Sequence, residues 1–255
     1  MRVTALQSGS NGNCIHVETR GVSLIFDAGI SGKQALQRLS AAGGDIHLAA
    51  GVVISHDHAD HVRSAGVFQR KFGLPIYATA ETFQAAAARC SLGSVDDVRT
   101  FRAGQALQFG PVKVETIPTP HDGADGTAFV IDDGPRRFGI LTDLGHVFDG
   151  LGELVGSLDA VLLESNYDPQ MLASGPYPAF LKRRIRGPSG HISNIESAEL
   201  LARCAGRRLR WACLGHLSEH NNRPELAIAT HRQIVGSGLA LHVASRYGSV
   251  GPFDV

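Results

Sequence analysis

The feature that most constrains this chain is the segment 55–61, which reads SHDHADH. Three His and one Asp follow the pattern HxHxDH, directly after the apolar run VVI. His56 and His58 alternate along an extended turn and can hold one metal ion, while Asp60 and His61 lie further on and can hold a second. Imidazole nitrogens and carboxylate oxygens suit Zn²⁺, Mn²⁺ or Fe²⁺. A metal site on the end of a buried strand is therefore predicted; a solvated His-rich loop is the alternative.

The overall composition excludes several classes of protein. The chain has 255 residues, 24 basic and 24 acidic side chains, and 12 His. This length can bury one large core, and the zero net charge means that nucleic-acid binding would need a local basic patch. No apolar stretch reaches ~18 residues, so we expect no membrane-spanning helix. The start, MRVTALQSGS, lacks a signal-peptide core, and the four Cys show no CxxC spacing, so we expect buried reduced thiols and a cytoplasmic protein.

Short strand-like runs bounded by Gly and Asn alternate with helical runs. Strands are expected at Val3–Leu6, Ile15–Glu18, Ser23–Phe26, Gly51–Ile54, Pro75–Ala78, Val112–Thr119, Thr127–Ile131, Arg137–Thr142, Leu158–Leu163, Arg210–Leu214 and Leu239–Val243. Helices are expected at Lys33–Ala42, Ala65–Phe72, Ala80–Cys90, Ser193–Cys204 and Pro224–Val235. Two β-rich blocks with flanking helices and no linker predict an α/β fold, a four-layer αββα sandwich, as one domain over residues 1–255.

The cluster and four later motifs resemble the metallo-β-lactamase superfamily. The motifs are FDAG at 26–29, PHD at 120–122, LTDLG at 141–145 and LGHLS at 214–218, and they appear in the family's order. The resemblance covers nearly the whole chain and implies the αββα fold with two divalent metal ions. It implies one ion on His56, His58 and His121, a second on Asp60, His61 and His216, Asp143 as the bridging ligand, and Asp27 as a residue that orients a ligand.

Each later motif has a structural alternative when it is taken alone. Asp27 could be a turn residue, and Asp143 could cap a helix. His121 could be a surface residue after Pro120. His216 competes with His220 in the same loop, and we favour His216 because it directly follows the predicted strand.

A further motif indicates the branch of the superfamily. The bridging position is Asp143, where the antibiotic-hydrolysing members place Cys, so β-lactam hydrolysis is not expected. The sequence SGHISN at 189–194 resembles the GHxS/T element of ribonuclease Z, whose His assists phosphodiester cleavage without binding metal. The resemblance gives His191 that role and gives Glu164, in LLESN, a supporting one. Alternatively, His191 is a loop residue that caps a helix.

The helix expected after this motif adds a possible anion contact. Ser193, followed by Glu196, has the spacing of a capping box and predicts a helix N-cap. Free backbone N–H groups at a helix N-terminus favour phosphate oxygens. We therefore expect Ser193 and Asn194, together with Asn166, to contact substrate.

Two insertions that other nucleases of the superfamily carry are missing from this chain, which limits the branches that it can resemble. No tRNA-binding arm lies between His121 and Asp143, and no inserted domain separates Asp143 from His216. With the N-terminal SGSNGNC, the chain most resembles the compact bacterial WalJ/YycJ-type exonucleases. The expected activity is hydrolysis of nucleic-acid phosphodiester bonds, most simply as a DNA exonuclease, by a metal-bridged hydroxide. By this resemblance, Asp60 and Asp143 would hold the ions, and His191, if protonated, would donate a proton to the leaving oxygen.

Basic residues concentrate around the SGHISN motif. The stretch 181–211 carries eight basic and only two acidic residues, a net charge of +6. The basic residues are Lys182, Arg183, Arg184, Arg186, Arg203, Arg207, Arg208 and Arg210. We expect Arg183 and Arg184 to contact a nucleic-acid backbone, although ordinary solvated charge is the alternative. A small-molecule hydrolase (thioester, lactone or cyclic phosphodiester) and a non-catalytic metal-binding regulatory module remain the other functional hypotheses. The sequence does not identify the metal, does not distinguish DNA from RNA as the substrate, and does not predict the oligomeric state.

Overall fold

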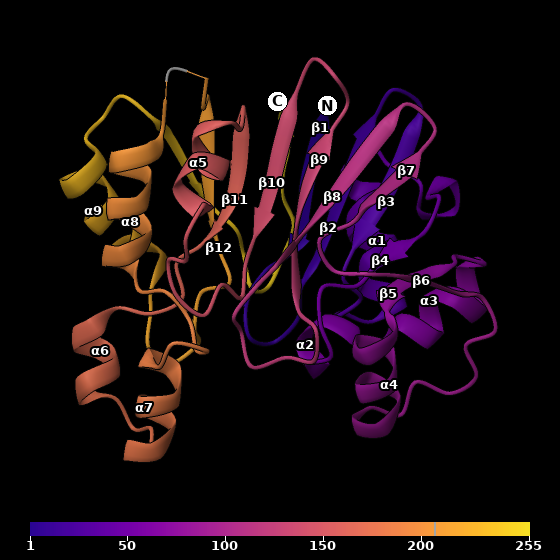
Figure 1. Ribbon diagram of the computed structural model, residues 1–255, viewed down its shortest axis with the longest axis horizontal. Coiled ribbons are helices and arrows are strands. Elements are labelled where there is room, and N and C mark those ends of the chain that lie inside the picture. Colours follow the sequence, from indigo (N-terminus) through magenta and orange to yellow (C-terminus); the bar gives the residue numbers. More distant parts are fainter. Residues whose placement is uncertain (207) are drawn as a thin grey trace.

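The computed structural model describes residues 1–206 and 208–255, and it consists of two facing β-sheets with helices on the outside (Figure 1). In spatial order the first sheet contains β14 (Val250–Asp254), β1 (Arg2–Gln7), β2 (Cys14–Thr19), β3 (Val22–Phe26), β4 (Val52–Val53), β5 (Ile76–Thr79) and β6 (Val98–Phe101). The second contains β13 (Ala240–Val243), β12 (Trp211–Gly215), β11 (Ala160–Glu164), β10 (Arg137–Leu141), β9 (Thr127–Asp132), β8 (Val112–Pro118) and β7 (Ala106–Phe109). This arrangement confirms the predicted four-layer α/β fold.

The helices divide between the two outer faces and one small lobe. The first sheet is covered by α1 (Gly32–Ala41), α3 (Ala65–Phe72) and α4 (Ala80–Arg89), with η1 (Ile46–Leu48) and α2 (Ala59–Val62) in its connections. The second sheet is covered by α5 (Leu151–Gly156), α8 (Asn194–Cys204) and α9 (Pro224–Val235). The lobe consists of α6 (Pro169–Ser174) and α7 (Ala179–Arg186), below the second sheet in Figure 1.

The main core lies between the sheets and draws on both halves of the chain. Its inward side chains alternate along antiparallel strands, as in β8, where Val112 and Val114 are buried and Lys113 is exposed. Phe26 from the first sheet packs against Phe129 from the second, with ring centroids 5.2 Å apart. Both sheets therefore depend on the same buried apolar surface.

Parallel pairing is the aspect of the fold that places the functional residues. Strands β10, β11, β12 and β13 are parallel neighbours, and so are β3, β4, β5 and β6. Carboxyl ends of parallel strands meet at one edge of a sheet, where open α/β sheets bind ligands. In Figure 1 both of these edges point downward, towards α2 and the α6–α7 lobe.

Several elements differ from the sequence-based expectation. Strands β6, β7 and β14 and helices α2, α5, α6 and α7 were not predicted, since each is short and buries few apolar side chains. The predicted capping box of Ser193 and Glu196 is present at the start of α8. All four Cys are free thiols, but Cys90 and Cys204 are only half-buried. In the described part of the chain no helix is long and apolar enough to cross a membrane.

Candidate metal centre

Strand ends bring the candidate ligands together. Asp27 follows β3, the segment 55–61 follows β4, Asp143 follows β10, and His216 follows β12. Asp27, Asp143 and His216 all have positive φ, at 64°, 56° and 54°. Residues other than Gly rarely adopt this backbone conformation, and backbone strain of this kind is found most often at functional sites. The backbone is thus turned sharply at three strand ends that face one another.

The first group of ligand atoms comes from His56, His58 and His121, which lie within 4.8 Å of one another. His121 Nδ1 donates to the carbonyl of Gly190 at 2.8 Å, so its Nε2 faces the group. His58 Nε2 lies 3.4 Å from Asp122, and its Nδ1 lies 3.3 Å from His121 Nε2. Each imidazole thus turns one nitrogen inward while outer partners hold the other.

The second group comes from Asp60, His61 and His216, again within 4.8 Å. Asp27 accepts a 2.7 Å hydrogen bond from His61 Nδ1, and this bond fixes the tautomer that leaves Nε2 toward the group. Asp60 Oδ2 lies 3.3 Å from His216 Nε2 and 3.5 Å from His61 Nε2. Gly29 permits this packing, because a Cβ there would lie 1.7 Å from the carbonyl oxygen of Asp60.

Asp143 lies between the two groups. Its Oδ2 is 3.3 Å from His61 Nε2, and its Oδ1 is 3.4 Å from His216 Nδ1 and 3.5 Å from His121 Nε2. One buried carboxylate therefore touches both three-residue groups. This is the position that the sequence-based interpretation gave to the bridging ligand.

Buried atoms at this centre fit a divalent cation. His56 Nε2 and Asp143 Oδ2 are buried and find no hydrogen-bond partner within the described residues. Such atoms cost free energy unless another partner satisfies them. A cation bound between the groups would satisfy both, and the nitrogen and carboxylate donors suit Zn²⁺-like ions.

The charge balance supports the same conclusion. Burial raises the pKa of the Asp143 carboxyl, but His216, His61, His56 and His121 together hold it well below its usual range. Burial and the neighbouring His61 lower the pKa of His56 well below its ordinary value. Burial also opposes charge on His216, yet nearby carboxylates raise its pKa to about 10. The carboxylates thus hold positive charge at the centre, which a bound cation would supply in place of protons.

Glu164 and His191 form a pair beside these groups. Glu164 is fully buried, and its Oε1 accepts a 2.7 Å hydrogen bond from His191 Nδ1. Its Oε2 accepts from the backbone amides of Leu144 and Ile192. Burial raises the pKa of Glu164, but His191 and other donors lower it to about 2. An ionised Glu164 therefore holds the ring of His191, which is partly exposed toward the pocket.

A pocket of about 210 Å³ opens over the metal centre. Its floor contains residues of both three-residue groups together with Asp143 and His191. Its outer wall comes from the α6–α7 lobe. The lining residues are Ser10, His58, Asp60, Asp143, Asn166, Tyr177, Leu181, Arg184, Ile185, His191, His216 and Ser218.

Some residues expected to contact substrate are turned away from this pocket. Ser193 forms the capping box, and Asn194 is fully buried and hydrogen-bonded to Ser165 and Asn222. Asn166 lines the pocket, but its amide donates to the carbonyl of His216 and so also positions that loop. These contacts indicate a structural role for Ser193 and Asn194.

The same distinction applies to two further candidates. Arg184 lines the pocket, whereas Arg183 is exposed on α7 outside the lining. His220, the competitor of His216, lies outside the cluster with its ring beside Tyr177. The structure therefore brings together all seven residues expected to bind metal and both residues expected to support them.

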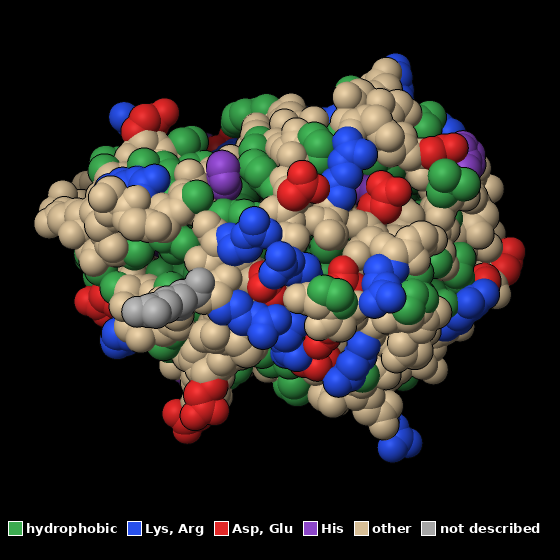
Figure 2. All heavy atoms as spheres, turned by 90° about the horizontal axis from the view of Figure 1, so that it is seen from above, with side chains coloured by type: hydrophobic (Ala, Val, Ile, Leu, Met, Phe, Trp, Pro, Cys, Tyr) green, Lys and Arg blue, Asp and Glu red, His purple; other side chains and the backbone are tan. Residues whose placement is uncertain are grey.

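The basic stretch 181–211 is split by the fold. Its first part lies on α7 beside the pocket, whereas Arg208 and Arg210 precede β12, whose far end leads to His216. At ~3.3 Å per residue, this strand separates them from the metal edge by roughly 16 Å. Figure 2, seen from the opposite edge, shows Lys and Arg side chains gathered there with acidic neighbours, and Arg208 pairs with Asp159. The expectation that the whole stretch surrounds His191 is wrong; Arg207 lies outside the described residues.

Three contributors were not assigned from the sequence. Ser55 donates its backbone N–H and its hydroxyl to Asp27. The Asn13 amide lies 2.9 Å from His61 Nε2, and Asp122 links His58 to Arg184. Ser55 and Asp122 stand beside proposed ligands in the SHDHADH and PHD motifs, and Asn13 lies in SGSNGNC. The sequence indicated Asn13 only as a possible loop contact, and it did not show which partner each residue would have.

The fold and this centre define a member of a known superfamily. Residues 23–212 match the model of the β-lactamase superfamily domain, and the chain belongs to that family. It is 36% identical over 231 residues to exodeoxyribonuclease WalJ of Streptococcus pneumoniae, covering 90% of this chain and 86% of that protein. It is 33% identical over 235 residues to exodeoxyribonuclease YycJ of Bacillus anthracis, with coverage of 92% and 89%. The fold also resembles the metallo-β-lactamase fold protein YhfI of Bacillus subtilis, with a TM-score of 0.72, 18% identity, and coverage of 96% and 95%.

Proposed function

We propose that this protein is a metal-dependent hydrolase of nucleic-acid phosphodiester bonds and acts on DNA as an exonuclease. The observation that carries the proposal is the pair of three-residue groups joined by Asp143, with His191 facing the same pocket. The names of the two curated relatives support the substrate class. The β-lactamase superfamily supplies the hydrolytic fold.

The donor set suits two divalent ions, Zn²⁺ or Mn²⁺, with Fe²⁺ also compatible. His56, His58 and His121 would hold one ion, Asp60, His61 and His216 the other, and Asp143 would bridge them. When bound, such ions supply a nucleophilic water at neutral pH and neutralise negative charge that develops on the phosphoryl group. Asp27 keeps His61 oriented for this task through its hydrogen bond to Nδ1.

His191 is proposed to donate a proton to the leaving oxygen of the cleaved bond. Glu164 accepts from Nδ1, so the other ring nitrogen is left for the substrate. A carboxylate hydrogen-bonded to Nδ1 fixes the tautomer and the orientation of the imidazole. General acid catalysis of this kind contributes typically ~10²–10⁴-fold.

Helix α7 is proposed to hold the phosphate backbone near the centre. Arg184 lines the pocket and pairs with Asp122 at 2.5 Å, while Arg183 is exposed on the same helix. Arg side chains suit phosphate because their planar guanidinium groups donate two parallel hydrogen bonds. Binding by this helix predicts an affinity that falls as salt rises.

The test is a nuclease assay on purified protein with Mn²⁺ or Zn²⁺. Single- and double-stranded DNA and RNA carry a label at either the 5′ or the 3′ end, and bis(p-nitrophenyl) phosphate reports hydrolysis without nucleic-acid binding. We expect stepwise shortening of DNA from one end. Hydrolysis of thioesters or lactones, with no cleavage or salt-sensitive binding of nucleic acid, would instead establish a small-molecule hydrolase.

A further inference from the structure

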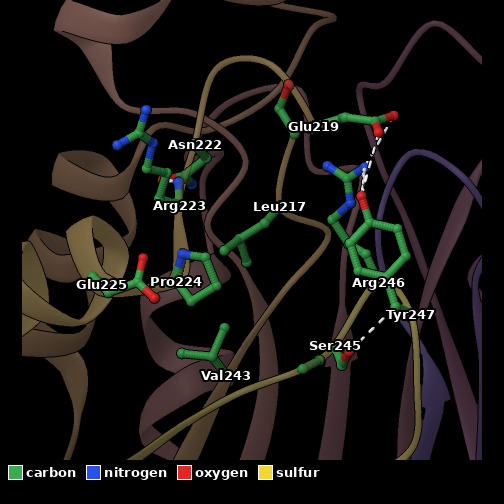
Figure 3. A pocket seen from close by; sticks show the side chains of 12 residues that line it. Leu217, Glu219, Asn222, Arg223, Pro224, Glu225, Val243, Ser245, Arg246 and Tyr247 are labelled. Carbon is green, nitrogen blue, oxygen red and sulfur yellow. Dashed lines mark hydrogen bonds and ion pairs between the residues drawn. The ribbon is translucent and has the colours of Figure 1, made fainter.

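A second pocket lies beside the metal centre and has no part in the proposed chemistry. It has a volume of about 300 Å³ and lies between the loop after β12, the start of α9 and the chain after β13. Leu217, Pro224 and Val243 form its apolar inner wall (Figure 3). Polar side chains stand on both sides of this wall, so the pocket combines an apolar surface with hydrogen-bonding edges.

One side of the pocket is an exposed aromatic ring held by an ion pair. Tyr247 is 71% exposed, and its hydroxyl donates a hydrogen bond to Glu219 at 3.3 Å. Arg246 pairs with Glu219 at 3.0 Å, and its guanidinium lies 5.4 Å from the centre of the Tyr247 ring (Figure 3). The ring is thus held at the pocket mouth rather than buried. Arg246 Nε–H is buried and lacks a partner in the residues that the structure describes.

The side-chain charges around the pocket are balanced and do not favour a phosphate over a neutral group. Arg223 and Arg246 are balanced by Glu219 and Glu225 among the lining residues. Side chains bind phosphate most strongly when Arg or Lys groups are free to donate charge-assisted hydrogen bonds. A planar heterocycle with donors and acceptors on its edge fits a wall of apolar and aromatic groups with charges of both signs.

The pocket adjoins the metal pocket at two points. Ser218, two residues after His216, lines both pockets. Ser10 lines the metal pocket, and its neighbour Gly9 lies against Arg246, since a Cβ on Gly9 would be 2.5 Å from Arg246 Cγ. A ligand that runs past Ser218 would therefore occupy both places.

We infer that this pocket binds one nucleobase of the substrate strand, next to the phosphodiester group at the metal centre. This inference rests on the proposed function and names how the strand is held. The base packs on the apolar wall and stacks on Tyr247, and this holds the neighbouring phosphate over the metal centre. The site selects an unstacked base, which a frayed or single-stranded end supplies.

The first test uses DNA ends that carry a single abasic nucleotide at each of the first four positions. Stacking of a base on an aromatic side chain contributes ~1–3 kcal/mol, so removing the bound base should lower kcat/KM roughly 5- to 150-fold at one position. In Tyr247→Ala, natural and abasic ends should be cut alike. Tyr247→Phe should restore the difference, and Leu48→Ala, which truncates an exposed side chain on η1, should behave as the wild type.

A binding measurement separates this inference from the proposed function. Calorimetric titration should show that deoxyadenosine monophosphate binds more tightly than 2-deoxyribose 5-phosphate, and that Tyr247→Ala removes the difference. Equal affinities, or a preference that survives in Tyr247→Ala, would overturn the pocket assignment even in an active nuclease. A Tyr247-dependent preference in a protein that cleaves no nucleic acid would support the pocket and overturn the nuclease.

Discussion

The two sheets contribute to the metal centre in different ways. The first sheet supplies four candidate ligands from one loop and a short helix, residues 56–61, after β4. The second supplies single residues from separate strand ends: His121 after β8, Asp143 after β10 and His216 after β12. Its supporting pair, Glu164 and His191, comes from two further segments.

This difference shows which parts of the centre depend on the rest of the fold. The ligands at 56–61 come from one contiguous segment, which Asp27 and the backbone amide of Ala124 hold through hydrogen bonds to Ser55, His61 and Asp57. The second sheet must hold three parallel strands in register to bring Asp143, Glu164 and His216 together. Errors in packing should therefore disturb the second contribution more than the first.

The largest effect is expected where the two contributions meet. Asp143→Asn keeps the shape and suits the positive φ, because Asn adopts this conformation readily. We expect hydrolysis of bis(p-nitrophenyl) phosphate to fall more than the ~10–100-fold typical of a residue that only supports a ligand. Asp125→Asn, at an exposed Asp with φ 48°, is the matched control and should retain activity. Wild-type activity in Asp143→Asn would rule out its bridging role.

Substitutions of the supporting residues in the two sheets should lower different properties, catalytic rate in one case and metal affinity in the other. Glu164→Gln should lower kcat roughly 10–100-fold with metal content retained, because it loosens His191. Asp27→Asn should instead lower metal affinity by a similar factor, since it frees His61. Metal content by mass spectrometry and steady-state kinetics distinguish the two. If Glu164→Gln combined with His191→Ala is additive, the pair does not act as a unit.

Away from the metal centre, the first sheet and the helical layer on the second sheet each contain one buried histidine that is neutral at pH 7. These two histidines should make the fold sensitive to acid. Burial lowers the pKa of His16, in β2, and of His231, in α9, to about 4. The unfolded chain takes up these protons below about pH 6.5, so stability is present above that pH and is lost as pH falls towards 4. Between pH 6.5 and 5 each should cost up to about 2 kcal/mol.

Urea unfolding at several pH values checks this expectation. His231→Gln and His16→Gln should each flatten the decline in stability with acid, and the double variant should flatten it by the sum. The two residues belong to different layers, so their effects should be independent. A pH slope unchanged in both variants would contradict the neutral-histidine interpretation.

The smallest effect concerns the two ends of the basic stretch. Arg183→Ala, on α7, should weaken DNA binding a few-fold and reduce the slope of log affinity against log salt by ~0.7–0.9. Arg210→Ala also removes an exposed charge, at the end of β12 away from the metal centre, and serves as the matched control. Equal losses in the two variants would mean that DNA contacts both ends of the molecule.

Much of the fold was predictable because its signals are local. The apolar strands of both inner sheets and the helices with caps or regular apolar spacing were found, including the start of α8 at Ser193. The α6–α7 lobe was missed since α7 buries only Ile185 and carries four basic residues. Its stability comes from packing on Tyr167 and Leu172, contacts that no local pattern displays.

The candidate site follows the same rule. The HxHxDH spacing alone indicates metal ligands, and family order adds His121, Asp143 and His216. Nothing in the spacing shows that Asn13 lies beside His61, or that Ser193 and Asn194 face inward. These outcomes depend on where a loop or a helix settles against its neighbours.

The sequence by itself indicated the kind of chemistry, because the HxHxDH spacing and the order of the family motifs show which atoms could hold a metal and carry a proton. Tertiary structure decided which of those residues share one centre, since parallel pairing brings strand ends together across long stretches of chain. It also divided the basic stretch between two edges and placed Tyr247 beside the metal pocket, thirty-one residues after His216. Such proximity is set by packing, which local sequence does not encode.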